Sequence, residues 1–414
     1  MNEEFKRGIP LAIANPSRHP LPYVKRLTRE NNINFRYFSL CQAIDGRGKS
    51  SFSPASSQTT YLGANLLHTC LPKSCPNLQN RIQKGVSSML SLTNGVISVG
   101  IDEDLGGEIR SIKMGKSEFL ADFDWLSPVE GSRSTTYGNA ILDWLSEYRG
   151  GWQVLFPNAG NENTVMGVPL PFHGEFGRTQ TTVLTKKKSE LIIRAGTRLP
   201  LILTRTYKLV PNKPILQIKQ TVSNESDLTV PFIWGEHPAF SLPRGSKINL
   251  PAGPILVDAN EMGELQDVKP GSTGTWPTVP DRVGGQIDLS VVPEADIERL
   301  CYLHDRPEGW AAMEHGKKVI GLSWDIEAFP HLWFWQEIGG KGFPFYGRAQ
   351  ITAIEPASTW PSFGLEAAIK SGQAFHLKPG EVRSAWTTFS VSNLPVKDLM
   401  KIKSIDSKGT FQTK

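Results

Sequence analysis

Three short segments of the sequence place histidine or glutamate beside glycine and proline. The first is PFHGEFGR, which contains His173, Glu175 and Arg178. The second is WGEHPAF, in which a proline follows His237, and the third is AIEP, in which a proline follows Glu355. Proline cannot donate a hydrogen bond to a sheet, so we expect both of these side chains near strand ends. Imidazole and carboxylate groups are the common proton carriers of enzymes, so the segments indicate acid–base chemistry.

Taken singly, each of these side chains also has a purely structural explanation. The glycines around His173 leave room for a ligand, but its imidazole also suits the backbone groups of a loop. His237 stands among aromatic residues, which is typical of a sugar site and equally of a packed core. Glu355 falls on the apolar face of its strand, so it is either used chemically or paired with Arg348 or Arg178.

Several other kinds of site are disfavoured. The sequence has no phosphate loop, no G-x-G-x-x-G, no nucleophile elbow and no HExxH motif. A metal site built from His173, Glu175, His237 and His376 lacks the H-x-H pairing expected of such centres. The four cysteines are too few for a disulfide framework and have no second pair at zinc spacing. We therefore expect neither a metal nor a cofactor.

Charge and composition divide the chain. The formal net charge is +5, but residues 1–85 hold 12 basic and 4 acidic residues, so the remainder is close to neutral. This distribution argues against nucleic acid as a partner. We expect a poorly ordered, basic, Ser-rich extension over residues 1–85, a folded domain over 86–398 and a tail over 399–414. No signal peptide or membrane span is visible, which favours a cytoplasmic setting without membrane contact.

Within the folded part, strand patterns dominate. The stretch MLSLTNGVISVGID alternates around Asn94-Gly95, a strong hairpin signal, and further alternating runs follow without helices between them. The 38 glycines and 30 prolines suit many short strands joined by turns. Only NAILDWLSEY and ADIERLCYL show helical patterns, and both are short. The prediction is an all-β fold, a large antiparallel β-sandwich with few short helices.

In their order along the chain, these segments resemble the aldose 1-epimerase (galactose mutarotase-like) family. The resemblance rests on GGEIRSI, FHGEFGR, EHPAFSL, AIEP and LKPGEVRSAWTTFSV, and it covers roughly residues 89–395. An ordered series of this kind is more specific than any single motif. It implies the supersandwich of that family, with the site on one concave face.

The resemblance also implies roles for individual residues. His237 takes the position of the general acid, Glu355 that of the general base, and His173 that of a substrate-binding histidine. The family's arginine segment reads FPNAGNEN here and contains no arginine, so Arg178 is a candidate replacement, and Asp288 is a candidate for the substrate-binding aspartate. The remaining expected substrate contacts are Glu175, Glu236, Trp335 and Arg348.

The implied activity is mutarotation, the interconversion of the α and β anomers of a free aldose. A carboxylate and an imidazole can open and reclose the ring by exchanging protons, without a cofactor. The expected partner is a small sugar. Two alternatives stay open: a non-catalytic carbohydrate-binding protein on the same fold, and an epimerase for a phosphorylated hexose. The second needs a basic cluster, for which Arg178, Arg348 and Lys341 are candidates.

Overall fold

All described residues belong to one unit of the chain. The computed structural model describes residues 89–123, 138–260 and 262–413. The chain divides into Met1–Lys73 and Ser74–Lys414, and every described residue lies in the second unit. The extension predicted over residues 1–85 lies outside the described residues.

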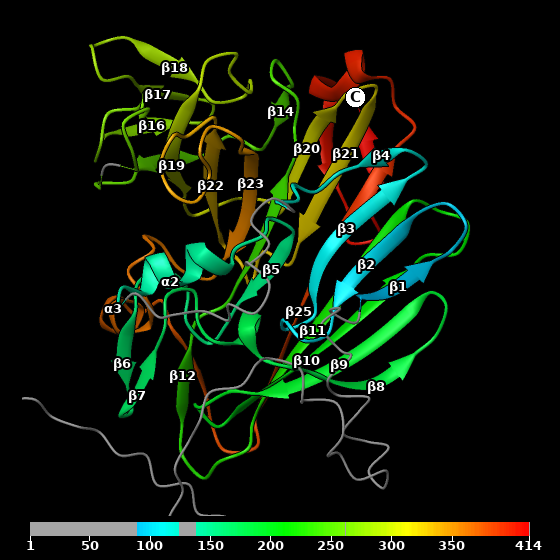
Figure 1. The fold of residues 1–414 in the computed structure, drawn as a ribbon, viewed down its shortest axis with the longest axis vertical. Helices are drawn as coiled ribbons and strands as arrows, with labels where there is room; N and C mark the ends of the chain where they lie inside the picture. The colour runs from blue at the N-terminus through cyan, green and yellow to red at the C-terminus, as the bar shows by residue number, and fades with distance from the viewer. Residues whose placement is uncertain (1–88, 124–137, 261, 414) are drawn as a thin grey trace, which may run out of the picture. The chain divides into compact units, whose positions relative to one another are not determined.

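Two large antiparallel sheets build this unit (Figure 1). The larger has thirteen strands in the order β1-β2-β3-β5-β13-β23-β22-β19-β15-β16-β17-β18, with β4 paired to β3. Its strands are β1 (Met89–Thr93), β2 (Ser98–Asp102), β3 (Glu108–Met114), β4 (Ser117–Glu118), β5 (Trp152–Leu155), β13 (Gly235–Phe240), β15 (Pro254–Val257), β16 (Thr273–Thr275), β17 (Thr278–Pro280), β18 (Gln286–Asp288), β19 (Ile297–Leu303), β22 (His331–Ile338) and β23 (Gln350–Ala357).

The second sheet has eight strands in the order β14-β20-β21-β25-β11-β10-β9-β8. Its strands are β8 (Thr182–Lys186), β9 (Glu190–Gly196), β10 (Leu201–Leu209), β11 (Ile215–Asn224), β14 (Ile248–Asn249), β20 (Trp310–His315), β21 (Lys318–Trp324) and β25 (Val382–Ser392). Three short two-stranded sheets and a few helices complete the described part: β6 (Asn163–Val165) with β7 (Val168–Leu170), β12 (Val230–Phe232) with β24 (Phe375–Leu377), β26 (Ile402–Ile405) with β27 (Phe411–Thr413), α2 (Ala140–Glu147), α3 (Leu365–Ser371), η2 (Phe176–Arg178) and η3 (Val396–Lys401).

The two sheets pack face to face around one apolar core. In β10, buried residues alternate with partly exposed ones along the whole strand, because successive side chains point to opposite faces. The inward residues of β10, such as Leu203, join a single cluster with inward residues of the larger sheet, such as Ile109 and Phe334. This arrangement confirms the all-β sandwich expected from the sequence.

The central strands of the larger sheet differ from the others because they are buried on both faces. Every residue of β13 and β22 is buried, and so is every residue of β23 after the first. One face of these strands meets the apolar core. The opposite face lies beneath helix α2 and the loops of the larger sheet, so side chains on that face line an enclosed space.

Two local predictions have different outcomes. The hairpin at Asn94-Gly95 is confirmed: Asn94 Oδ1 accepts hydrogen bonds from the backbone of Val96 and Ile97, and Gly95 has a φ of 86°. The helical interpretation of ADIERLCYL is wrong, because this segment forms strand β19. Its pairing with both β15 and β22 and its alternating burial override the weak helical pattern.

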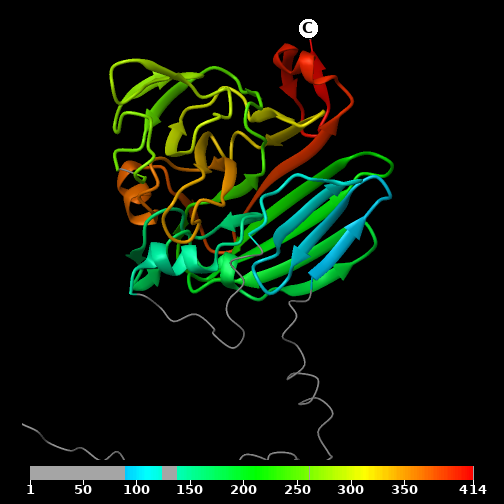
Figure 2. The same ribbon diagram turned by 45° about the horizontal axis from the view of Figure 1, so that its top comes forward.

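The C-terminal segment predicted as a tail forms η3 and the β26–β27 pair. Buried Leu399, Ile402 and Ile405 pack against Trp310 and Val319 of β20 and β21. Figure 2 shows this segment (red) next to those strands. Among the described residues, no helix has the length and apolar character needed to cross a membrane.

Candidate active site

The side chain of His237 lies on the face of the larger sheet that helix α2 covers, because of its position in β13. The strand lies between β5 and β23, and its alternation turns Glu236 toward the sandwich core and His237 away from it. The imidazole is 2% exposed, and its Nδ1 atom is buried without a hydrogen-bond partner. A buried polar atom without a partner is uncommon and marks a place where a ligand can supply the missing contact.

Glu355 lies on the neighbouring strand β23 and faces the same space. Its Oε2 atom is 3.7 Å from His237 Nε2, and its side chain is 3% exposed. Burial raises the pKa of Glu355 well above its usual range and lowers that of His237 to about 4. Both shifts favour the uncharged form of each side chain.

His173 is held in a fixed orientation by its backbone and one hydrogen bond. It has a φ of 61°, and Gly160 N–H donates to its Nδ1 at 3.0 Å. With Nδ1 accepting, the ring proton of the neutral imidazole resides on Nε2. Burial, then the charges of His237 and Arg178, lower the pKa of His173 well below its usual value. The ring centroids of His173 and His237 are 5.5 Å apart.

Helix α2 covers the three side chains. Asn139 caps the helix by accepting hydrogen bonds from two backbone amides of its first turn. Trp144, the buried residue of the helix, and Tyr148, which follows it, stack at 4.5 Å between ring centroids. The Trp144 ring also lies 4.7 Å from His173 and 5.6 Å from His237.

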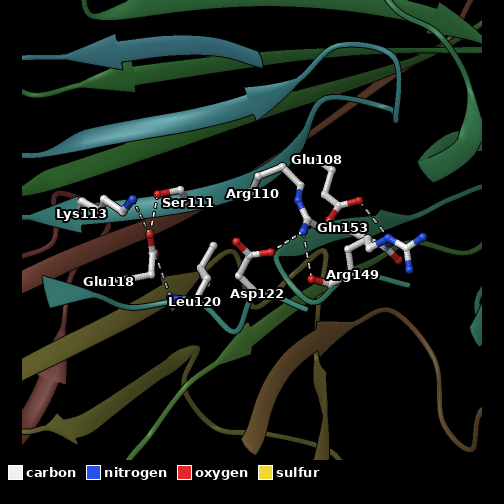
Figure 3. A network of polar contacts seen from close by, with 9 residues as sticks. All are labelled: Glu108, Arg110, Ser111, Lys113, Glu118, Leu120, Asp122, Arg149 and Gln153. Atoms are coloured by element: carbon white, nitrogen blue, oxygen red, sulfur yellow. Dashed lines mark hydrogen bonds and ion pairs between the residues drawn. The ribbon is translucent and has the colours of Figure 1, made fainter. Parts of the chain in front are cut away.

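A polar network that includes Glu108, Arg110 and Gln153 (Figure 3) extends to Trp144. Trp144 Nε1–H donates to Gln153 Oε1 at 3.2 Å, and Gln153 Nε2–H donates to Glu108 Oε2 at 3.1 Å. Arg110 forms ion pairs with Glu108 at 2.6 Å and with Asp122 at 2.8 Å. The GGEIRSI segment, one of those on which the resemblance rests, therefore supplies Glu108 and Arg110 to the network that holds the helix.

These elements line a cavity of about 370 Å³ that is open on one side. His173, His237 and Glu355 lie in its wall together with Trp144. Aromatic and apolar side chains form much of the rest, and polar groups are placed among them; these lining residues include Phe172, Asp258, Met262, Glu298, Leu300, Trp333, Trp335, Glu337, Phe345 and Ser362. A largely apolar cavity with a few convergent polar groups is the usual form of a small-molecule site.

The structure thus brings together four of the residues expected from the sequence, His237, Glu355, His173 and Trp335. Glu236 lies on the opposite face of β13. Adjacent residues of a strand point to opposite faces, so Glu236 must point away from the cavity when His237 points into it. There it binds Arg205 and Trp152 instead of a substrate.

The other four expected residues also lie away from the cavity wall. Glu175 pairs with Arg198 at 3.2 Å, and Arg178 pairs with Glu147 at 3.0 Å on the outer side of the site. Asp288 is exposed on β18 and accepts hydrogen bonds from the backbone and hydroxyl of Ser290. Arg348 is exposed in the turn before β23.

Several cavity residues were not identified in the sequence. Trp333 and Glu337 are two of them, and they alternate with the expected Trp335 in HLWFWQEI, so period-two alternation alone indicates that all three share a face. No sequence pattern indicates that Asp258 lines the cavity. In the structure it accepts a hydrogen bond from Tyr302 Oη, which also contacts Ser362 Oγ at 2.7 Å.

No cluster of three or more His, Cys, Asp and Glu side chains among the described residues has the arrangement of a metal centre. His376, weighed as a metal ligand in the sequence, is exposed on β24.

For the mutarotation that the sequence resemblance implies, replacing His173 with Ala is expected to raise KM more than it lowers kcat, with a loss in kcat/KM of about 10- to 100-fold, or about 1.4–2.8 kcal/mol. The variant removes an oriented Nε2–H donor but leaves the His237–Glu355 pair in place. Steady-state kinetics on a sugar substrate measures the split. A loss confined to kcat would contradict the assignment of His173 to binding.

Comparison with known proteins gives a family and a fold. The domain of unknown function DUF4432 matches residues 83–391. The structure is similar to the Slr1438 protein from Synechocystis sp. PCC 6803, with 19% identity, a TM-score of 0.55, and coverage of 74% of this chain and 96% of that one. It is also similar to a galactose mutarotase-like protein from Clostridium acetobutylicum, with 16% identity, a TM-score of 0.50, and coverage of 74% and 95%. No curated protein matches the chain. The fold is that of the galactose mutarotase-like proteins.

Proposed function

The chain belongs to the DUF4432 family of domains of unknown function, and we propose that it is a mutarotase that interconverts the anomers of a free aldose. The observation that carries this proposal is the buried pair of His237 Nε2 and Glu355 Oε2, 3.7 Å apart in the wall of an aromatic cavity. The anomeric hydroxyl and the ring oxygen of an aldose are attached to one carbon. Two adjacent hydrogen bonds from this pair therefore fit those two oxygens.

The proton transfers follow from the protonation of the pair. In ring opening, Glu355 gives its proton to the ring oxygen, the bond from that oxygen to the anomeric carbon breaks, and His237 takes the proton of the anomeric hydroxyl. After rotation about the neighbouring carbon–carbon bond, His237 returns a proton to the carbonyl oxygen as Glu355 takes the proton of the attacking hydroxyl. The resemblance assigns the opposite roles, with His237 as the acid that protonates the ring oxygen and Glu355 as the base that takes the hydroxyl proton; that exchange starts from the tautomer with the proton on His237 and places the sugar with its two oxygens exchanged.

The character of the cavity favours an uncharged sugar over a phosphorylated one. A phosphoryl group is normally held by Arg, Lys or backbone amides. None of the described residues that line the cavity is Arg or Lys, whereas Asp258, Glu298 and Glu337 do line it. Arg178, Arg348 and Lys341, the candidates for a basic cluster, are not part of this lining.

A non-catalytic sugar-binding protein is the weaker alternative. Binding alone does not need an acid and a base held together, and burying ionisable groups without partners is unfavourable. Such an arrangement is typical of catalytic sites, where the pKa values of proton donors and acceptors are shifted by their surroundings.

Polarimetry of freshly dissolved α-aldoses tests the proposal directly. The protein is expected to accelerate the approach to anomeric equilibrium over buffer, for free sugars and not for their phosphate esters. A panel of glucose, galactose, their disaccharides and glucose 6-phosphate separates these cases. Tight binding of a sugar without acceleration for any member of the panel would favour the non-catalytic alternative.

The pH dependence of kcat/KM has an expected sign. His237 must be neutral and Glu355 protonated in the free enzyme, so activity is present above about pH 4, the lowered pKa of His237. It is lost as pH rises through the raised pKa of Glu355. We therefore expect kcat/KM to stay level as pH falls through 6.5, the ordinary imidazole pKa. A drop in kcat/KM centred there would show that the imidazole titrates normally.

A further inference from the structure

Two carboxylates face each other at one end of the cavity. Glu298 on β19 and Glu337 on β22 are directly opposite in the strand register, and both line the cavity. Like charges in this cross-strand position repel each other. The arrangement is unfavourable for the empty protein, and a positively charged ligand group would offset it.

The hydrogen bonding of the pair is incomplete. Glu337 is 4% exposed, and its Oε1 atom is buried without a hydrogen-bond partner. Glu298 Oε2 accepts one backbone hydrogen bond, from Leu265 at 3.1 Å. Burial and then the charge of Glu298 raise the pKa of Glu337 to about 8, although the Gly340 amide acts in the opposite direction. Its Oε1 atom thus lacks a partner that would further stabilise the charge of the carboxylate.

Two glycines allow the backbone to close around the pair. A Cβ atom on Gly340 would overlap Glu337 Oε1, and one on Gly263 would overlap the carboxylate of Glu298. The loops therefore pack against the two carboxylates from outside, while the cavity gives access from inside.

The strand register sets the separation between this pair and the catalytic pair. Trp333 is opposite Glu355, and Glu337 lies four residues farther along the same strand. At about 3.3 Å per residue and about 4.8 Å between strands, the Cα atoms of Glu337 and Glu355 are about 14 Å apart. Trp333 and Trp335, on the same face, line the stretch between them. This span is longer than one pyranose ring.

We propose that the Glu298–Glu337 pair binds a protonated amine of the ligand, and that this ligand is an amine-bearing sugar longer than a monosaccharide. The inference rests on the proposed function, which places the anomeric carbon at His237 and Glu355. The tryptophans between the two ends offer stacking surfaces for sugar rings, and their faces also attract cations.

Titration calorimetry tests the cation site with three disaccharides of the same linkage. The disaccharide of glucosamine carries amines, its N-acetylated form carries neutral amides, and cellobiose carries hydroxyls. We expect the amine form to bind at least about tenfold more tightly than the other two. Glucosamine is expected to show no such advantage over glucose, because a single ring does not span the cavity. Equal affinities for the three disaccharides would overturn the proposal, and an equal advantage for glucosamine would overturn the length assignment.

Variants show whether the carboxylates cause the preference. Glu337→Gln and, separately, Glu298→Gln keep the side-chain size and should each abolish the preference for the amine form, whereas exposed Glu294→Gln should keep it. A preference retained in both cavity variants would overturn the proposal. Polarimetry on the same preparations separates the two ideas: amine preference without mutarotation would refute the function alone, and mutarotation without amine preference would refute the cation site alone.

Discussion

Replacing Glu355 with Gln is expected to lower kcat/KM for mutarotation by about 10²- to 10⁴-fold, the usual contribution of a positioned acid–base group. The amide has the size of the carboxylic acid but cannot pass a proton to the ring oxygen. The loss should appear mainly in kcat, because the cavity wall keeps its shape. Polarimetry across a range of sugar concentrations separates the two parameters.

The controls for this prediction use the partner residue and an exposed carboxylate. His237→Asn should cause a similar loss, and the double variant should be little worse than either single one, because the two side chains act as one unit. Glu327→Gln, on the exposed surface, should have wild-type activity. If Glu355→Gln retains more than about a tenth of the activity while remaining folded, Glu355 is not the proton carrier.

The sequence indicates the position of a residue in the fold best where the local chain determines the geometry. Proline after His237 and after Glu355 predicts that both lie near strand ends, and this is wrong, because Pro238 lies within β13 and Pro356 within β23. The two residues nevertheless occupy strands next to each other in the larger sheet. The glycine after His173 has a φ of 77°, and a side chain there would collide with the backbone of Phe156. Glycine is the residue that fits this position, so the sequence itself indicates the geometry of the loop.

The failures arise where the outcome depends on partners far along the chain. Nothing near Asp288 indicates that β18 lies at the edge of the larger sheet, several strands from His237. The helical pattern of ADIERLCYL was overridden by pairing with β22, which also places Glu298 opposite Glu337. Strand register depends on packing between segments far apart in the sequence, so it cannot be predicted from a single sequence by local patterns.

Glu236 differs from these cases, because the face of the strand on which it lies can be predicted from the sequence. Adjacent residues of a strand point to opposite faces, so Glu236 and His237 cannot both line one cavity. The structure places Glu236, with an exposure of 0%, between the sheets. It accepts hydrogen bonds from Trp152 Nε1–H at 2.7 Å, from Arg205 Nη2–H at 3.3 Å and from Gln220 Nε2–H. Its expected role is therefore in stability.

Replacing Glu236 with Leu is expected to lower the free energy of unfolding by about 3–5 kcal/mol, because it leaves the Arg205 guanidinium buried without its counter-charge. Urea denaturation measures the change. As a control, Glu225→Gln at an exposed ion pair with Arg194 should change stability by less than about 1 kcal/mol.

The double variant Arg205→Met, Glu236→Leu shows how much the ion pair contributes to the free energy of unfolding. Removing both charges also removes the desolvation of each, so the double variant should recover most of the stability lost in Glu236→Leu. Gln220 and Trp152 still lose an acceptor, which sets a limit on that recovery. If the double variant is as unstable as the single one, the loss comes from these neutral donors and not from the stranded guanidinium. In either case the face of β13 that carries Glu236 contributes to stability, and the proposed chemistry takes place on the face that carries His237.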